Sequence, residues 1–215
     1  MKKNIIKKIT AAVLSLTMLS ALTACGTAGS GSEADESYKV AIVKQMDHPS
    51  LDEIAAAVAA ELDGYVADGA KITYEIYSGQ GDQTILKQIG DQAIVDQVDA
   101  IIPIATTAAQ CMVTAAEGTE IPIVYAAISD PVGAGLTDIP TVTGVSDALN
   151  TPFILDMMFA ADPDIQTVGL LYSLSEPNSE MPIAEAKAYL DAKGIPYIEK
   201  TGNSADEVIT AATAL

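Results

Sequence analysis

Short apolar runs alternate with helix-like stretches along most of this 215-residue chain. The apolar runs that predict β-strands are Tyr38–Lys44, Lys71–Tyr77, Ala100–Ile104, Ile121–Ile128, Val142–Val145, Thr167–Tyr172 and Pro196–Glu199. The stretches that predict helices are Leu51–Leu62, Gln83–Val95, Ala108–Ala116, Pro152–Ala161, Pro182–Ala192 and the residues from Ala205 onward. Alternation of this kind, with apolar strands, is typical of parallel sheets buried between helices. The pattern therefore predicts an α/β fold with helices on both faces of its parallel sheets.

The alternation pauses between Asp130 and Thr151, where glycine, proline, serine and aspartate concentrate, and then resumes. We interpret the pause as a crossover between two lobes. Lobe 1 and the crossover would occupy residues 38–148, and lobe 2 would occupy residues 149–215. Lobe 2 would then hold only two strands, which are too few for a stable open sheet. We therefore expect the chain to be a fragment of a longer protein, with lobe 2 incomplete.

The N-terminus has the pattern of a secretory signal. Four lysines precede an apolar run that ends in Leu22-Thr23-Ala24-Cys25. This ending resembles the lipobox of bacterial lipoproteins, in which the cysteine is lipidated and becomes the first mature residue. An ordinary signal peptide with a chance cysteine is the alternative. We expect a signal peptide over residues 1–24, a lipid on Cys25, a flexible tether over residues 25–37, and a location outside the cytoplasm at the cell membrane.

Charge narrows the range of partners. Loss of the four signal lysines would leave 7 basic residues against 29 acidic ones, a net charge of −22. Nucleic acids and anionic lipid headgroups are poor partners for such a surface, so we expect no nucleic acid partner. All basic residues are lysines, and without arginine no guanidinium can clamp a carboxylate. A carboxylate-bearing ligand would instead need backbone N–H groups and hydroxyls.

Motifs for catalysis and cofactors are absent from the sequence. It has no Walker loop, zinc-ligand spacing or GxSxG elbow. If Cys25 carries lipid, Cys111 is alone and no disulfide forms in the mature chain. His48 is the only histidine, so a surface hydrolase would have to pair it with Ser129 or Ser175. We keep that enzyme as the less favoured alternative and expect no catalytic residue, metal or cofactor.

Polar segments follow the predicted strands at their carboxyl ends, which is where open parallel sheets bind ligands. Four such segments belong to lobe 1, and a fifth follows Thr167–Tyr172 in lobe 2. This arrangement is typical of a protein that holds a small molecule in a cleft. Several residues in these segments also stand just before helices and could instead be N-caps. They are Asp47, Asp82, Thr106, Thr107 and Ser175.

The same segments, taken in order, resemble one protein family. They are Asp47-His48-Pro49, Gln80-Gly81-Asp82-Gln83, Ala105–Gln110, Ser129–Leu136, Thr143–Asp147 and Ser175–Ser179. The series is similar to that of ABC-transporter substrate-binding lipoproteins of the tryptophan/tyrosine-type group, and the similarity covers residues 38–215. The resemblance implies a type I periplasmic-binding fold of two Rossmann-like lobes that close by a hinge near Gly144. It also implies capture of a small solute, often an aromatic amino acid, for delivery to a membrane permease.

The resemblance and the lack of arginine together suggest roles for individual residues. Thr107, Ser175, Asn178 and Ser179 are first choices for holding a carboxylate, and Asp130 or Glu176 for pairing with an ammonium group. Pro177 departs from the small residue expected there. The full set of candidate ligand-binding residues is His48, Asp82, Gln83, Thr106, Thr107, Gln110, Ser129, Asp130, Ser146, Ser175, Glu176, Asn178 and Ser179. A sensory module that passes a ligand-bound shape to a membrane receptor would have the same sequence features and is a further alternative.

Lipidation can be tested directly. In a bacterial host, Cys25→Ala should move the protein out of the membrane fraction, because no thiol remains to carry the acyl chains that hold it there. Fractionation and immunoblotting of the variant and the wild type measure this. Equal retention of both proteins in the membrane fraction would rule out a lipid anchor at Cys25.

Overall fold

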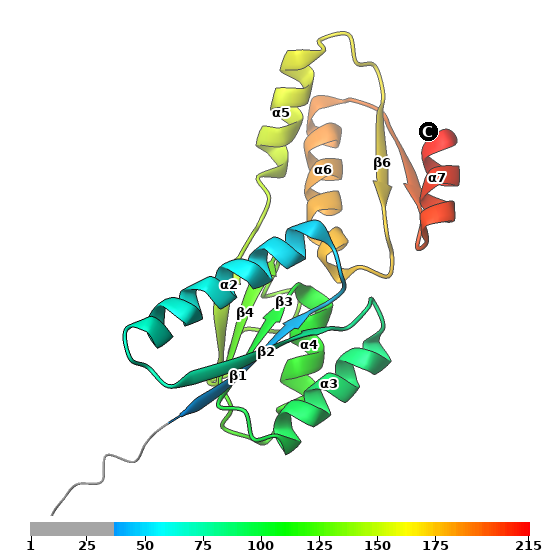
Figure 1. The fold of residues 1–215 in the computed structure, drawn as a ribbon. Helices are drawn as coiled ribbons and strands as arrows, with labels where there is room; N and C mark the ends of the chain where they lie inside the picture. The colour runs from blue at the N-terminus through cyan, green and yellow to red at the C-terminus, as the bar shows by residue number, and fades with distance from the viewer. Residues whose placement is uncertain (1–36) are drawn as a thin grey trace, which may run out of the picture. The chain divides into compact units, whose positions relative to one another are not determined.

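The computed structural model describes residues 37–215. The predicted signal peptide, Cys25 and nearly all of the predicted tether lie outside the described residues. Five parallel strands form the first sheet, in the order β2-β1-β3-β4-β5 (Figure 1). Their bounds are Tyr38–Lys44 (β1), Ile72–Ser78 (β2), Ala100–Ile104 (β3), Ile123–Ile128 (β4) and Val142–Ser146 (β5).

Helices cover both faces of this sheet, as the apolar character of its central strands predicts. The helices are α2 (Pro49–Ala67), α3 (Gln83–Val95) and α4 (Thr106–Ala115). Successive residues of β1 point to opposite faces. Val40 and Ile42 pack with α2, whereas Ala41 and Val43 pack with α3 and α4, on the other side of the sheet (Figure 1). Burial of β1 on both faces explains why its middle is a continuous apolar run.

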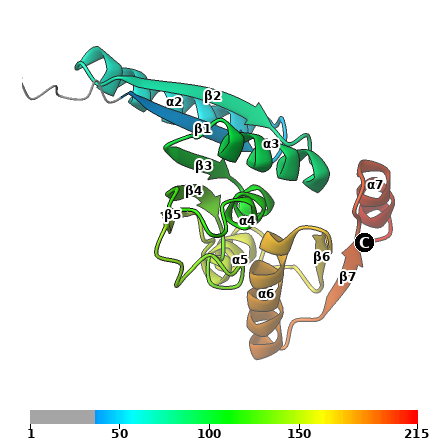
Figure 2. The same ribbon diagram turned by 90° about the horizontal axis from the view of Figure 1, so that it is seen from below.

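A second, two-stranded parallel sheet follows in the chain. Its elements are α5 (Thr151–Ala161), β6 (Val168–Tyr172), the 3₁₀ helix η1 (Pro177–Ser179), α6 (Glu180–Lys193), β7 (Tyr197–Thr201) and α7 (Ala205–Thr213). Leu155, Leu170 and Leu190 form a core between α5, β6 and α6. Figure 2 shows α6 and α7 on opposite sides of the two strands. Both sheets are thus parallel and flanked by helices, which confirms the predicted α/β class.

Two helix boundaries differ from the prediction for local reasons. Helix α2 begins at Pro49 rather than Leu51, because His48 caps it and proline suits the first helical position. It then continues past Gly64 to Ala67, since a glycine inside a helix weakens it by only about 1 kcal/mol. No helix among residues 37–215 combines the length and apolar character needed to cross a membrane.

Gly144 is a close-packed strand residue, and a hinge near it stays a prediction. It lies within β5, and a Cβ atom there would overlap the backbone oxygen of Tyr125 on β4. The chain leaves the first sheet three residues further on, through residues 147–150, which have no regular structure and lead directly into α5.

This packing predicts opposite effects for two glycine substitutions. Gly144→Ala should destabilise the full-length protein by roughly 1–3 kcal/mol, because the new methyl group overlaps the backbone of β4. Gly64→Ala is the matched control: nothing lies near its Cβ position, so it should stabilise α2 by about 0.5–1 kcal/mol. Urea denaturation followed by circular dichroism measures both. If the urea midpoints of Gly144→Ala and Gly64→Ala shifted in the same direction relative to the wild type, the packing described for the two glycines would be contradicted.

Candidate ligand-binding site

The carboxyl ends of β1, β2, β3 and β4 are tied together by backbone hydrogen bonds. The Gln45 N–H donates to the Ile104 carbonyl at 3.2 Å, and the Gly81 N–H donates to the Gln45 carbonyl at 2.9 Å. Gln80, Ala105 and Ala127 have positive φ angles of 53°, 78° and 57° at the same edge. Positive φ is unfavourable for residues with a Cβ atom, and such strain gathers at functional sites.

Helix α4 starts at this edge without a side-chain cap. Its N-cap is Ala105, whose methyl group cannot accept a hydrogen bond. The alternative interpretation, in which Thr106 or Thr107 caps the helix, is therefore wrong, since both lie inside its first turn. Thr106 is only 4% exposed, and its hydroxyl is buried without a hydrogen-bond partner among the described residues. A helix start brings N–H groups without intrahelical partners, and together with an unpaired hydroxyl it can bind an anionic group.

Gln45 contacts this helix start and was not among the residues predicted from sequence. It is 8% exposed, and its Oε1 accepts a hydrogen bond from the Thr107 N–H at 3.3 Å. Its Nε2 donates to the two carboxylate oxygens of Glu176 at 3.2 and 3.5 Å. Glu176 precedes η1, which itself packs against α4. Gln45 therefore links two predicted site residues, Thr107 and Glu176, that lie far apart in the sequence.

Thr107 and two more predicted residues, Gln83 and Gln110, line a groove of about 550 Å³ between α3 and α4. The Gln110 side chain donates to the Ala134 carbonyl at 3.1 Å, which fixes its position. Cys111 also lines this groove, and burial raises the pKa of its thiol. A raised pKa favours the neutral thiol, which is a poor nucleophile.

His48 has a structural role at the start of α2. Its Nδ1 accepts a hydrogen bond from the Ser50 N–H at 3.2 Å, so His48 rather than Asp47 is the N-cap. Asp47 instead pairs with Lys44 at 2.9 Å, and Lys44 also contacts Asp52. Hydrogen bonds from Lys44 and Ser78 lower the pKa of Asp47, while those to Asp52 and Asp47 raise the pKa of Lys44.

Asp82 caps α3, as one of the two interpretations predicted. Its Oδ1 accepts a hydrogen bond from the Thr84 N–H at 2.6 Å. This contact lowers the pKa of the Asp82 carboxyl group. Capping leaves a second acceptor oxygen on the carboxylate. Ligand contact by Asp82 therefore stays a prediction.

Ser129, Asp130 and Ser146 lie around the end of β4 and β5. The Ser129 hydroxyl donates to Asp147 at 3.0 Å, and Asp130 accepts from the Gly133 N–H at 2.9 Å in a turn. Ser146 is the exposed last residue of β5. These contacts shape the loops, and the ligand-binding roles of the three residues remain predictions.

The serine-rich segment after β6 is held by the loop after β7. The Ser173 hydroxyl lies 2.8 Å from the Ser175 hydroxyl and donates to Asn203 Oδ1 at 3.1 Å. Ser175 is therefore not an N-cap; Glu176 precedes η1, of which Asn178 is the middle residue. Ser179 is the N-cap residue of α6 and makes no side-chain capping bond.

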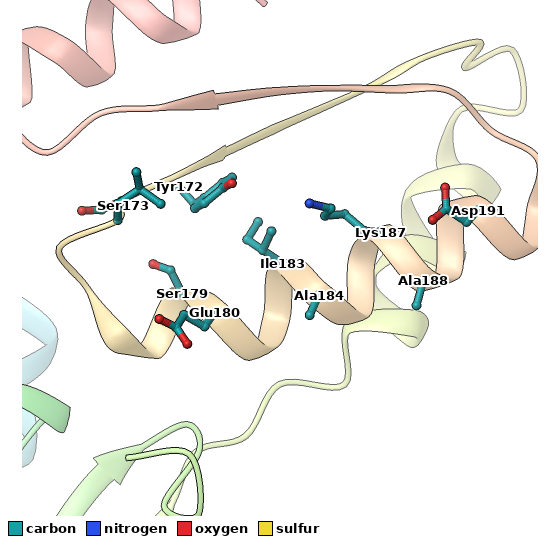
Figure 3. Close-up of a pocket in the computed structure, with 10 residues that line it drawn as sticks. Tyr172, Ser173, Ser179, Glu180, Ile183, Ala184, Lys187, Ala188 and Asp191 are labelled. Atoms are coloured by element: carbon teal, nitrogen blue, oxygen red, sulfur yellow. The ribbon is translucent and has the colours of Figure 1, made fainter. Parts of the chain in front are cut away.

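Ser179 lines a second pocket, of about 540 Å³, between β6 and α6. Figure 3 shows Ser179 and Ile183 on the helix facing the strand that carries Tyr172. Glu199 anchors one wall, because it accepts a hydrogen bond from the Tyr172 hydroxyl at 2.9 Å and pairs with Lys187 at 3.0 Å. The bond to Glu199 raises the pKa of the Tyr172 hydroxyl. Residues 37–215 contain no group of three or more His, Cys, Asp or Glu side chains placed to hold a metal ion.

The fold and this site agree with one family of proteins. The chain matches the family described as ABC transporter substrate binding protein over residues 39–215, and it belongs to that family. The family comprises solute-binding proteins rather than enzymes, and the fold is that of type I periplasmic binding proteins, of which the chain covers a part.

Individual relatives are also similar. A tyrosine-binding protein of Clostridioides difficile (strain R20291) is 29% identical over 228 residues, which cover 99% of this chain and 64% of that protein. The ABC domain in complex with L-Trp from Streptococcus pneumonia has a TM-score of 0.76 at 29% identity, over 83% of this chain and 62% of that one. A ligand-free, open substrate binding protein with adhesive properties from Clostridium difficile has a TM-score of 0.59 at 29% identity, with the same coverage. The chain thus spans just under two thirds of the length of these relatives.

The capping role of Asp82 predicts a specific dependence on pH. At neutral pH, Asp82→Ala should lower stability more than Asp82→Asn, because the asparagine amide oxygen still accepts from the Thr84 N–H. The folded pKa of Asp82 lies below the unfolded value, so its charge stabilises the fold above about pH 4. That contribution is lost as the pH falls through the folded pKa, and the wild type should then approach Asp82→Asn. Urea midpoints at pH 7 and pH 3 measure this, and equal midpoints of wild type and Asp82→Ala at pH 7 would contradict the capping role.

Proposed function

We propose that the whole protein is the solute-binding component of an ABC importer and captures an amino acid, with aromatic amino acids as the first candidates, for a membrane permease. The observation that carries the proposal is the start of α4, where the N-cap residue Ala105 supplies no side-chain hydrogen bond and the buried hydroxyl of Thr106 has no partner among residues 37–215. The relatives support the class of ligand, since one is called tyrosine-binding and another was solved with L-Trp.

The chemistry of the edge suits a zwitterion. A ligand carboxylate would accept hydrogen bonds from the first turn of α4 and from Thr106, and the positive end of the helix dipole would favour its charge. The Glu176 carboxylate, linked to the same turn through Gln45, would attract an ammonium group. Ser175, Asn178 and Ser179 lie next to Glu176 in sequence and would add polar contacts.

Binding without turnover also fits the chemistry of the reactive side chains. The Nδ1 atom of His48, the only histidine, is used to cap α2. Burial raises the pKa of the Cys111 thiol and so disfavours its nucleophilic form. The hydrolase alternative needs His48 beside Ser129 or Ser175, whereas Ser129 bonds to Asp147 and Ser175 contacts Ser173.

The remaining parts of the proposal concern domains and location. We propose that the first sheet belongs to a lobe at residues 38–148 and the second to a lobe that begins at residue 149. Residues 147–150 would then form a crossover about which the lobes close. A lipid on Cys25 would hold the protein at the membrane beside the permease, outside the cytoplasm, where proteins of this family act.

The unpaired hydroxyl of Thr106 distinguishes a ligand-binding role from a structural one. In the full-length protein, Thr106→Val should weaken binding of L-tryptophan and L-tyrosine roughly tenfold or more, because a bond to a charged group is lost. Its stability should be equal to or above that of the wild type, since a buried hydroxyl without a partner is removed. Titration calorimetry and urea denaturation measure the two effects.

Thr119→Val is the matched control. Its hydroxyl donates to the Ala116 carbonyl and accepts from the Ile121 N–H, so the control should lose stability and keep its affinity. If Thr106→Val bound the amino acids with unchanged affinity, the ligand would not bind at the start of α4. Failure of the wild type to bind any proteinogenic amino acid would refute the proposed function itself.

A further inference from the structure

The backbone of Gln45 is held in place on two sides. Its N–H donates to the last residue of β3, Ile104, and its carbonyl accepts from Gly81 in the turn after β2. The side chain therefore starts from a fixed point at the edge of the sheet. Its amide lies between the start of α4 and the segment that follows β6.

The orientation of the Gln45 amide follows from its partners. A backbone N–H can only donate, so the amide oxygen must face Thr107. An ionised carboxylate only accepts, so the amide NH₂ must face Glu176. The side chain thus presents an acceptor to α4 and a donor to Glu176.

An α-amino acid presents the same pair of functions. Its carboxylate is an acceptor, its ammonium group is a donor, and both sit on one carbon atom. In the amide, the two functions are neutral, whereas in the amino acid both are charged. At the Thr107 N–H, the ligand carboxylate would replace a neutral acceptor by a charged one, and charge-assisted hydrogen bonds are about twice as strong as neutral ones. At Glu176, the bond from the amide already has a charged acceptor, and the ligand ammonium adds the attraction of two opposite charges. The amino acid can therefore displace the amide from both partners.

We infer that Gln45 is a placeholder for the ligand. Until an amino acid binds, its amide occupies the Thr107 N–H and the Glu176 carboxylate; the ligand's carboxylate and ammonium then take over these two contacts. The inference rests on the proposed function and extends it to a residue that tunes affinity. In the protein without ligand, Gln45 gives the Thr107 N–H at the start of α4 a hydrogen-bond partner. The free energy needed to break the hydrogen bonds of Gln45 makes ligand binding correspondingly weaker.

Replacing Gln45 tests the inference. Gln45→Met keeps the length and volume of the side chain but can neither accept from Thr107 nor donate to Glu176. In the full-length protein, it should bind L-tryptophan and L-tyrosine about tenfold more tightly, because nothing has to be displaced. The Thr107 amide proton should exchange faster in the variant alone and become protected when L-tryptophan is added. Calorimetry and NMR hydrogen exchange measure these effects.

A matched control and a measurement without mutation complete the test. Gln92→Ala removes an exposed amide on α3 that donates to Asp96, the residue after the helix, and it should leave affinity unchanged. In the wild type, adding L-tryptophan should shift the NMR signals of the Gln45 side-chain NH₂ group and speed the exchange of its protons with water. This measurement does not depend on the folding of any variant. Weaker or equal binding by Gln45→Met, or Gln45 signals that stay unchanged on titration, would overturn the placeholder role. If the wild type binds neither amino acid, the proposed function fails and the inference fails with it.

Discussion

Parallel pairing of the strands is the constraint on which the site depends. Because β1, β2, β3 and β4 run in the same direction, their carboxyl ends meet at one edge, and α2, α3 and α4 all begin there. Each helix start brings N–H groups without intrahelical partners to this edge. The molecule satisfies those of α2 and α3 locally through His48 and Asp82, but it leaves α4 with an alanine at the capping position. At α4 the side chain of Gln45 accepts from the Thr107 N–H in place of a local cap, and the Thr106 hydroxyl has no partner among residues 37–215.

The buried surroundings of α4 increase the energetic importance of the hydrogen-bonding groups at its start. Its first turn is buried, and hydrogen bonds in such an environment are stronger than in water, so an unpaired group there is also more costly. Ala105 adopts φ 78° and ψ 158°, a conformation that glycine would adopt more easily. The sheet tolerates this strain because the Ala105 N–H still donates to Ala126 on β4. Rigid strands thus hold a strained turn and polar groups in place before any solute arrives.

Much of the fold could be predicted from sequence, because burial imposes a pattern on neighbouring residues. All seven predicted strands occur, with ends displaced by two residues or fewer. The N-cap residues were harder to predict. Asp47 and His48 both precede α2, and the sequence does not distinguish between them. The structure shows that Asp47 pairs with Lys44 and that His48 accepts the capping hydrogen bond. Gln45 could not be found this way, since its partner Glu176 lies 131 residues away and no local periodicity encodes such a contact. A polar residue directly after a buried strand was the one available signal.

The segment between the two sheets is tied down at both ends. The Asp147 N–H donates to the Ile128 carbonyl at 3.1 Å, which anchors one end to β4. At the other end, the Asn150 side chain accepts from the Phe153 N–H at 3.2 Å and caps α5. Only Ala148 and Leu149 lie between these anchors, and each residue has two soft backbone dihedrals. Along this connection, any rotation of α5 relative to β4 would be taken up by the few backbone torsions between Asp147 and Asn150, so the direction of α5 depends on a very short stretch of chain.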